Sequence, residues 1–113
     1  MLHDIVLSEK DSGTSFELYK GSLVEIRLEG NPTTGYVWAA SPETDNDLIL
    51  KVLDDSGYIP AKTALTGSGG TFVFKYMAAN PGTARLVFGY ARSWETVPPI
   101  KTWTVTVKVN DVH

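Results

Sequence analysis

The segment 102–109 reads Thr-Trp-Thr-Val-Thr-Val-Lys-Val, and its polar and apolar side chains alternate without a break. Successive residues of a β-strand point to opposite faces, so this alternation predicts a strand with one face in a core and one in water. Segments 22–29, 71–77 and 83–90 also carry apolar side chains at alternate positions, although Leu23 and Val87 depart from the pattern. These four segments therefore predict the central strands of a β-sheet protein.

Less regular strands are expected at residues 2–7, 14–18, 35–40, 48–53 and 58–61. Clusters of Gly, Pro, Asn and Asp separate the segments and predict turns. The only helical start is Ser41-Pro42-Glu43, where a capping serine precedes a proline. Seven to nine short strands at this spacing predict an all-β fold, an antiparallel β-sandwich of immunoglobulin-like size.

Composition restricts the class of protein. The chain has 113 residues, of which 42% are hydrophobic and 20% charged, so we expect one globular domain spanning 1–113. A formal net charge of -3 argues against a nucleic-acid partner, because phosphate binding needs a basic face. The apolar stretches are far shorter than the roughly 20 residues of a membrane span, and the start lacks a signal-peptide pattern. We expect a soluble protein with no membrane partner, and a cytoplasmic, periplasmic or secreted location fits.

Catalytic groups are scarce. The chain has no cysteine, which excludes disulfides and a thiol nucleophile. His3 and His113 lie at opposite ends of the chain, which argues against a Ser-His-Asp triad or a histidine metal site. Asp45-Asn46-Asp47 lacks the glycine and distal glutamate of a calcium loop. We therefore expect no catalytic residue, no metal and no cofactor.

Segment 30–38, Gly-Asn-Pro-Thr-Thr-Gly-Tyr-Val-Trp, carries more than a chain reversal needs. Pro32 fixes its own φ angle and restricts Asn31, while Gly30 and Gly35 allow backbone angles that other residues resist. This combination predicts a stiff, projecting loop with two threonines at its tip. The alternative is an ordinary capped turn with the two aromatic residues in the core.

Two further connections are unusual. Segment 66–71, Thr-Gly-Ser-Gly-Gly-Thr, lacks the lysine of a phosphate-binding loop, but its glycines would let another backbone approach closely. Segment 89–95, Gly-Tyr-Ala-Arg-Ser-Trp-Glu, gathers the residue types that dominate protein interfaces. The plainer interpretations are a flexible hairpin for the first and, for the second, a tryptophan that folds back on the sandwich.

Together, Asn-Pro-Thr-Thr-Gly-Tyr-Val-Trp at 31–38, Gly-x-Gly-Gly at 67–70 and aromatic-x-Arg-x-Trp at 90–94 resemble the chagasin-type inhibitors of cysteine peptidases, over roughly residues 15–109. The resemblance implies an immunoglobulin-type sandwich that presents three neighbouring loops as a wedge. The wedge would reversibly and noncovalently fill the active-site cleft of papain-like cysteine proteases, of the papain or cathepsin type. The expected protein is then a monomeric inhibitor and not an enzyme.

The resemblance also implies roles for residues. Thr33 would lie closest to the catalytic Cys and His of the enzyme, and Gly67 to Gly70 would pair with enzyme backbone. Arg92 and Trp94 would pack on the opposite flank. Ser93 stands where the family commonly has proline, so we expect a less preorganised third loop. The implied protease-binding residues are Asn31, Pro32, Thr33, Thr34, Gly35, Tyr36, Gly67, Ser68, Gly69, Gly70, Thr71, Arg92, Ser93 and Trp94.

The alternative from another class is a noncatalytic sandwich module that binds a carbohydrate or a surface partner through exposed aromatic rings. The candidates are Tyr36, Trp38, Trp94 and Trp103. Trp38 and Trp103 fall on strand faces that the alternation assigns to the core, which leaves Trp94 as the ring free to stack. A purely structural domain is the third possibility.

Overall fold

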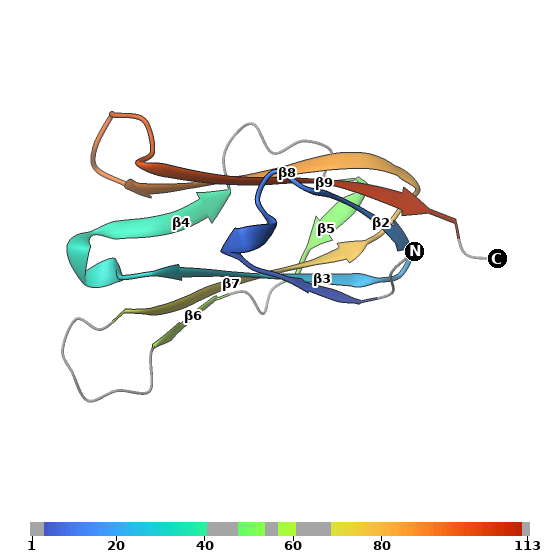
Figure 1. Cartoon of the computed structure of the whole chain (residues 1–113), viewed down its shortest axis with the longest axis horizontal. Helices are drawn as coiled ribbons and strands as arrows, with labels where there is room; N and C mark the ends of the chain where they lie inside the picture. Colours follow the sequence, from blue (N-terminus) through green and yellow to red (C-terminus); the bar gives the residue numbers. More distant parts are fainter. Residues whose placement is uncertain (1–3, 41–47, 54–56, 61–68, 112–113) are drawn as a thin grey trace.

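The structure is a computed structural model that describes residues 4–40, 48–53, 57–60 and 69–111. These residues form two β-sheets that pack face to face (Figure 1). The first sheet contains β1 (Ile5–Leu7), β3 (Leu23–Gly30), β7 (Gly70–Ala78), β5 (Leu50–Val52) and β6 (Gly57–Pro60). The second contains β2 (Ser15–Tyr19), β9 (Lys101–Asn110), β8 (Gly82–Arg92) and β4 (Tyr36–Ala40). The predicted all-β sandwich is confirmed, with nine strands in the described residues.

The core lies between the sheets and is built by the alternation seen in the sequence. Every second residue of β3 is buried, and β9 shows the same pattern from Trp103 to Val109. Phe88 of β8 lies in the middle of the core, with its ring centre 5.9 Å from that of Trp103 and 4.6 Å from that of Phe74. Because each buried aromatic ring removes a large apolar area from water, these rings contribute strongly to the stability of the fold.

Strand direction differs in part from the expected antiparallel arrangement. Most neighbouring strands are antiparallel, but β1 pairs with β3 and β2 pairs with β9 in parallel. After β1 the chain crosses from the first sheet to the second through a short 3₁₀ turn, η1 (Glu9–Asp11). The crossing places β2 on the edge of the opposite sheet, where its neighbour β9 runs in the same direction. The Trp103 indole N–H donates to Ser8 O at 2.9 Å and fixes this crossing to the core.

The strands differ from their predicted bounds at the ends. β5 is shorter than the predicted 48–53, and β6 begins one residue earlier than predicted. Leu23 is exposed at the start of β3, while Val87 is buried although it faces away from the core. The predicted helical start at Ser41-Pro42-Glu43 lies outside the described residues.

No helix within the described ranges is long and apolar enough to cross a membrane.

One end of the sandwich gathers the segments that the sequence singled out. The turn between β3 and β4, the end of β6, the start of β7 and the β8–β9 connection all lie at this end (Figure 1). Strand register agrees, since Gly30 pairs with Gly70, Pro60 pairs with Gly70, and Tyr36 pairs with Arg92. The C-terminal end of β9 lies at the opposite end (Figure 1). The fold therefore brings three distant sequence segments to one surface.

Candidate functional site

The first loop is a capped 3₁₀ turn, η2 (Pro32–Thr34), which the sequence predicted only as a stiff projection. The side-chain oxygen of Asn31 accepts hydrogen bonds from the backbone N–H of Thr33 at 3.1 Å and from its hydroxyl at 2.6 Å. Gly35 ends the turn with a φ of 88°, in the left-handed region that favours glycine. Cap, proline and glycine thus each hold one part of the turn in place.

The tip of the turn presents Thr33 and Thr34, both exposed. The Thr34 hydroxyl donates to the backbone oxygen of Asn31 at 2.7 Å, as the Thr33 hydroxyl donates to the Asn31 side chain. A hydroxyl has one proton to donate and two lone pairs. Since both protons are used within the turn, the tip offers hydrogen-bond acceptors to a partner.

Aromatic rings from β4 and β8 support the first loop from inside the sandwich. The Tyr90 hydroxyl accepts a hydrogen bond from the Asn31 backbone N–H at 3.0 Å. The Tyr90 ring centre lies 5.4 Å from that of Tyr36 and 5.0 Å from that of Trp38. The Trp38 indole N–H donates to Glu29 O at 3.0 Å. These contacts connect the loop to both strands that flank it.

We expect Tyr90→Phe to lower the free energy of unfolding by about 1–3 kcal/mol, because the partly buried Asn31 N–H loses its acceptor while the rings stay packed. Urea unfolding followed by tryptophan fluorescence measures the change. Tyr36→Phe is the matched control, since the described residues show no hydrogen bond to its hydroxyl. Equal destabilisation by the two variants would contradict the role assigned to the Tyr90 hydroxyl.

The described part of the second loop lies against the first. Gly67 and Ser68 lie outside the described residues. Gly69 has a φ of 83°, and a Cβ placed on it would lie 3.0 Å from the backbone oxygen of Gly30. A Cβ on Gly70 would overlap Ile59 O. The glycines are needed because backbones of neighbouring strands approach closely there, and the pairing of β7 begins at Gly70 and continues with Thr71.

The third loop follows β8 and contacts the first loop through its side chains. Arg92 Nε–H donates to Thr34 O at 3.0 Å, and its guanidinium lies 4.4 Å above the Tyr36 ring. Trp94 is 69% exposed, so it does not fold back into the core. The edge of its ring lies against Gly35, where a Cβ would overlap Cη2 and lie 2.9 Å from Cζ2. Ser93 is exposed between the two side chains.

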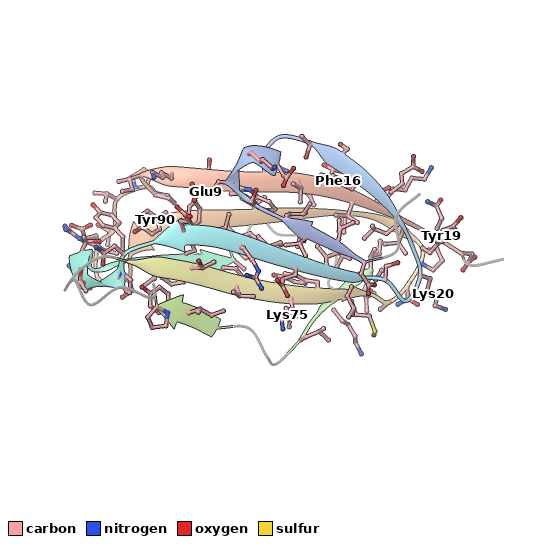
Figure 2. All side chains as sticks on the ribbon, turned by 60° about the horizontal axis from the view of Figure 1, so that its bottom comes forward. Glu9, Phe16, Tyr19, Lys20, Lys75 and Tyr90 are labelled. Atoms are coloured by element: carbon pink, nitrogen blue, oxygen red, sulfur yellow. The ribbon has the colours of Figure 1, made fainter. Side chains whose placement is uncertain are left out.

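A polar hollow of about 640 Å³ lies beside the first and second loops. Its lining includes Glu9, Glu29, Asn31, Tyr90 and Lys101. Figure 2 shows Glu9 and Tyr90 near each other at this end of the molecule. Among the described residues, no group of three His, Cys, Asp or Glu is placed to hold a metal ion. This end of the molecule therefore presents hydroxyl groups, backbone atoms and aromatic rings, together with the charged side chains of Glu9, Glu29 and Lys101.

A family model, described as the chagasin family peptidase inhibitor I42, matches residues 17–109 of this chain. The chain belongs to the chagasin family of peptidase inhibitors. Amoebiasin-1 of Entamoeba histolytica is 33% identical over 105 residues, which cover 92% of this chain and 96% of that protein. Chagasin of Trypanosoma cruzi is 32% identical over 109 residues, with the same coverage.

A solved structure gives the same result for the fold. The cysteine protease inhibitor EhICP2 from Entamoeba histolytica superimposes with a TM-score of 0.80 at 21% identity, covering 96% of this chain and 96% of that chain. The family resemblance, the sandwich fold and the expectation of an inhibitor in place of an enzyme are thus confirmed.

The sequence did not indicate the roles of two residues that shape the site in this chagasin-family protein. Tyr90 belongs to the third motif, but its hydroxyl accepts a hydrogen bond from the N–H of Asn31, which lies 59 positions away in the sequence. Glu95 pairs with Arg92 at 3.6 Å within the third loop. Its spacing of three residues from an arginine was the available signal. Trp38 (5% exposed) and Trp103 (1%) are buried, and the Tyr36 ring packs against Tyr90 and Arg92. Of the four aromatic candidates for carbohydrate binding, Trp94 is therefore the one with an exposed ring.

Proposed function

We propose that this chain reversibly and noncovalently inhibits papain-like cysteine proteases by placing its three loops in their active-site cleft. The main observation in support of this proposal is that the three loops contact one another and form one surface. Gly69 lies against the backbone of Gly30, and Trp94 lies against Gly35. A surface held together before binding loses little conformational entropy on binding, which favours affinity.

The first loop suits a protease active site that it must occupy without being cut. Proteases of this type attack an extended peptide, whereas the backbone from Asn31 to Gly35 is closed by two turn hydrogen bonds, Thr34 N–H to Asn31 O at 3.2 Å and Gly35 N–H to Pro32 O at 2.9 Å. The Thr33 hydroxyl offers lone pairs, and the imidazolium of a thiolate–imidazolium pair offers N–H donors. Thr33 would therefore lie nearest the catalytic pair.

The flanking loops would extend the contact to both sides of the cleft. In the second loop, Gly67, Ser68 and Gly69 would exchange backbone hydrogen bonds with the enzyme. Gly70 and Thr71 already pair with β3 and β6, so they would hold the loop in place beside the cleft. Trp94 would supply a large apolar contact on the other flank, where its exposed ring fits the residue types of interface hot spots. Together the loops can approach the usual size of a protease–inhibitor interface, about 800 Å² per partner.

EhICP2, which shares the fold, is described as a cysteine protease inhibitor, and this description supports the proposed class of target. The absence of cysteine from this chain agrees with a noncovalent mode, since no mixed disulfide with the catalytic thiol can form.

The test is titration of papain and a cathepsin with the purified chain, followed by rapid dilution. We expect saturable inhibition, full recovery of activity after dilution, and no covalent adduct by intact-mass spectrometry. Absence of inhibition at micromolar inhibitor, or inhibition that dilution fails to reverse, would overturn the proposal.

A further inference from the structure

The Arg92 side chain is unusual because it contacts β4, the first loop and the rest of the third loop at once. Its Nε–H donates to Thr34 O at 3.0 Å, and its Nη1 lies 3.6 Å from the Glu95 carboxylate. One face of the guanidinium lies 4.4 Å above the Tyr36 ring, and the Trp94 ring centre is 6.0 Å away. These contacts join β4, the first loop and the third loop at a single side chain.

Rotation of the Arg92 side chain toward an enzyme would compete with this arrangement. A guanidinium holds its N–H donors in one fixed plane, so turning the Nε side toward a partner would break the bond to Thr34 O and the ion pair with Glu95 together. Trp94, in contrast, is free to contact a partner over most of its ring, since only its edge lies on Gly35. The two side chains of the third loop therefore have different tasks.

We infer that Arg92 is a positioning residue, which locks the first and third loops together and orients Trp94, and that Trp94 makes the contact with the enzyme on this flank. The contact of Trp94 with an enzyme rests on the proposed function. The link that Arg92 makes between the first and third loops is a property of the free protein. It assigns Arg92 a different task from the direct contact implied by the resemblance.

The same lock accounts for the serine at position 93. Glu95 N–H donates to Arg92 O at 3.2 Å, which closes a four-residue turn with Ser93 in its second position and Trp94 in its third. Proline favours the second position of such a turn because it fixes φ. Without that constraint, the contacts of Arg92 with Glu95 and Thr34 hold the turn.

The first test compares Arg92→Met, which removes the charge and the hydrogen-bond donors, with Arg92→Lys, which keeps the charge but loses the planar fork. Time-resolved fluorescence anisotropy of the free protein measures the motion of Trp94, against a background of Trp38 and Trp103 shielded in the core. We expect a larger fast component for both variants, more for Met. We also expect an inhibition constant for papain raised about tenfold by Arg92→Met, a typical cost for losing preorganised contacts.

The readouts separate the inference from the proposed function. Weakened inhibition with unchanged Trp94 motion would make Arg92 a direct contact and overturn the inference, while the proposed function would stand. If the variants show increased Trp94 motion but the wild-type protein does not inhibit papain, the proposed function would be overturned. The role of Arg92 in holding the two loops together would then still stand. Arg85→Met, on the same strand but paired with Thr106 away from the loops, is the matched control and should change neither readout.

A proline at position 93 gives the decisive variant. Ser93→Pro in the wild-type chain should tighten inhibition by about two- to fivefold, because proline favours the second position of such a turn and the free loop loses alternative conformations. In the Arg92→Met background the same change should recover most of the lost inhibition. If Arg92 binds the enzyme directly, proline cannot replace it, so absence of recovery would overturn the inference.

Discussion

Thr33→Trp is expected to raise the inhibition constant for papain by at least about 100-fold, the largest loss of inhibition among single changes at the tip. Thr33 is exposed in the middle of η2, and the proposal puts it nearest the catalytic pair of the enzyme. An indole there would hold the whole wedge away from the cleft, since the three loops contact one another and form one surface. The backbone N–H of Thr33 keeps its bond to Asn31, so the turn itself should survive.

Steady-state inhibition and thermal unfolding are measured on the same samples. Thr83→Trp, an exposed threonine on β8 at the opposite end of the strand from Arg92, is the matched control. It should leave both the inhibition constant and the melting temperature unchanged. Thr33→Ser, which keeps the hydroxyl, should inhibit within a few-fold of wild type. Full inhibition by Thr33→Trp would exclude Thr33 from the cleft.

Much of the fold followed from the sequence because the two-residue period reports directly on which side chains are buried. Segment 102–109 became β9 with Trp103, Val105, Val107 and Val109 in the core. Strand direction could not follow in the same way. The alternation is identical in parallel and antiparallel strands. The parallel pairing of β1 with β3 and of β2 with β9 depends on a chain crossing at η1 that has no periodic signal.

The site was predictable as three motifs but not as a set of contacts between them. Pro32 and Gly35 predicted a stiff loop because their effects on the backbone are local: proline fixes its own φ angle, and glycine permits angles that other residues resist. The bond from Arg92 to Thr34 joins residues 58 positions apart and exists only because β4 and β8 pair in the register that places Tyr36 opposite Arg92. Register is a property of the assembled sheet, so the lock between the loops emerged only in the structure.

Gly35→Ala should weaken inhibition by at least about 30-fold, the factor that corresponds to losing a 2 kcal/mol hot-spot contact. Two effects combine at this position. The left-handed backbone, with a φ of 88°, costs a residue with a Cβ about 1–2 kcal/mol of folding stability. The added methyl also overlaps Trp94 Cη2, so the ring must leave the position in which it faces the enzyme.

Gly13→Ala separates these effects. Gly13 has a φ of 85°, nearly that of Gly35, but a Cβ there would meet nothing within 4 Å. It lies beside β9, where its N–H donates to Thr104 O at 2.7 Å. Urea unfolding should show a similar backbone cost for both variants with an additional loss for Gly35→Ala, and only Gly35→Ala should weaken inhibition.

Removing the indole tests whether the additional loss comes from the overlap. In a Trp94→Ala background, Gly35→Ala should cost no more folding stability than Gly13→Ala does, because the methyl then has no ring to displace. Inhibition should also be no weaker in the double variant than in Trp94→Ala alone, since the two changes remove the same contact. Additive losses of inhibition would mean that Gly35 and Trp94 act on the enzyme independently, and that the first and third loops do not form one binding unit.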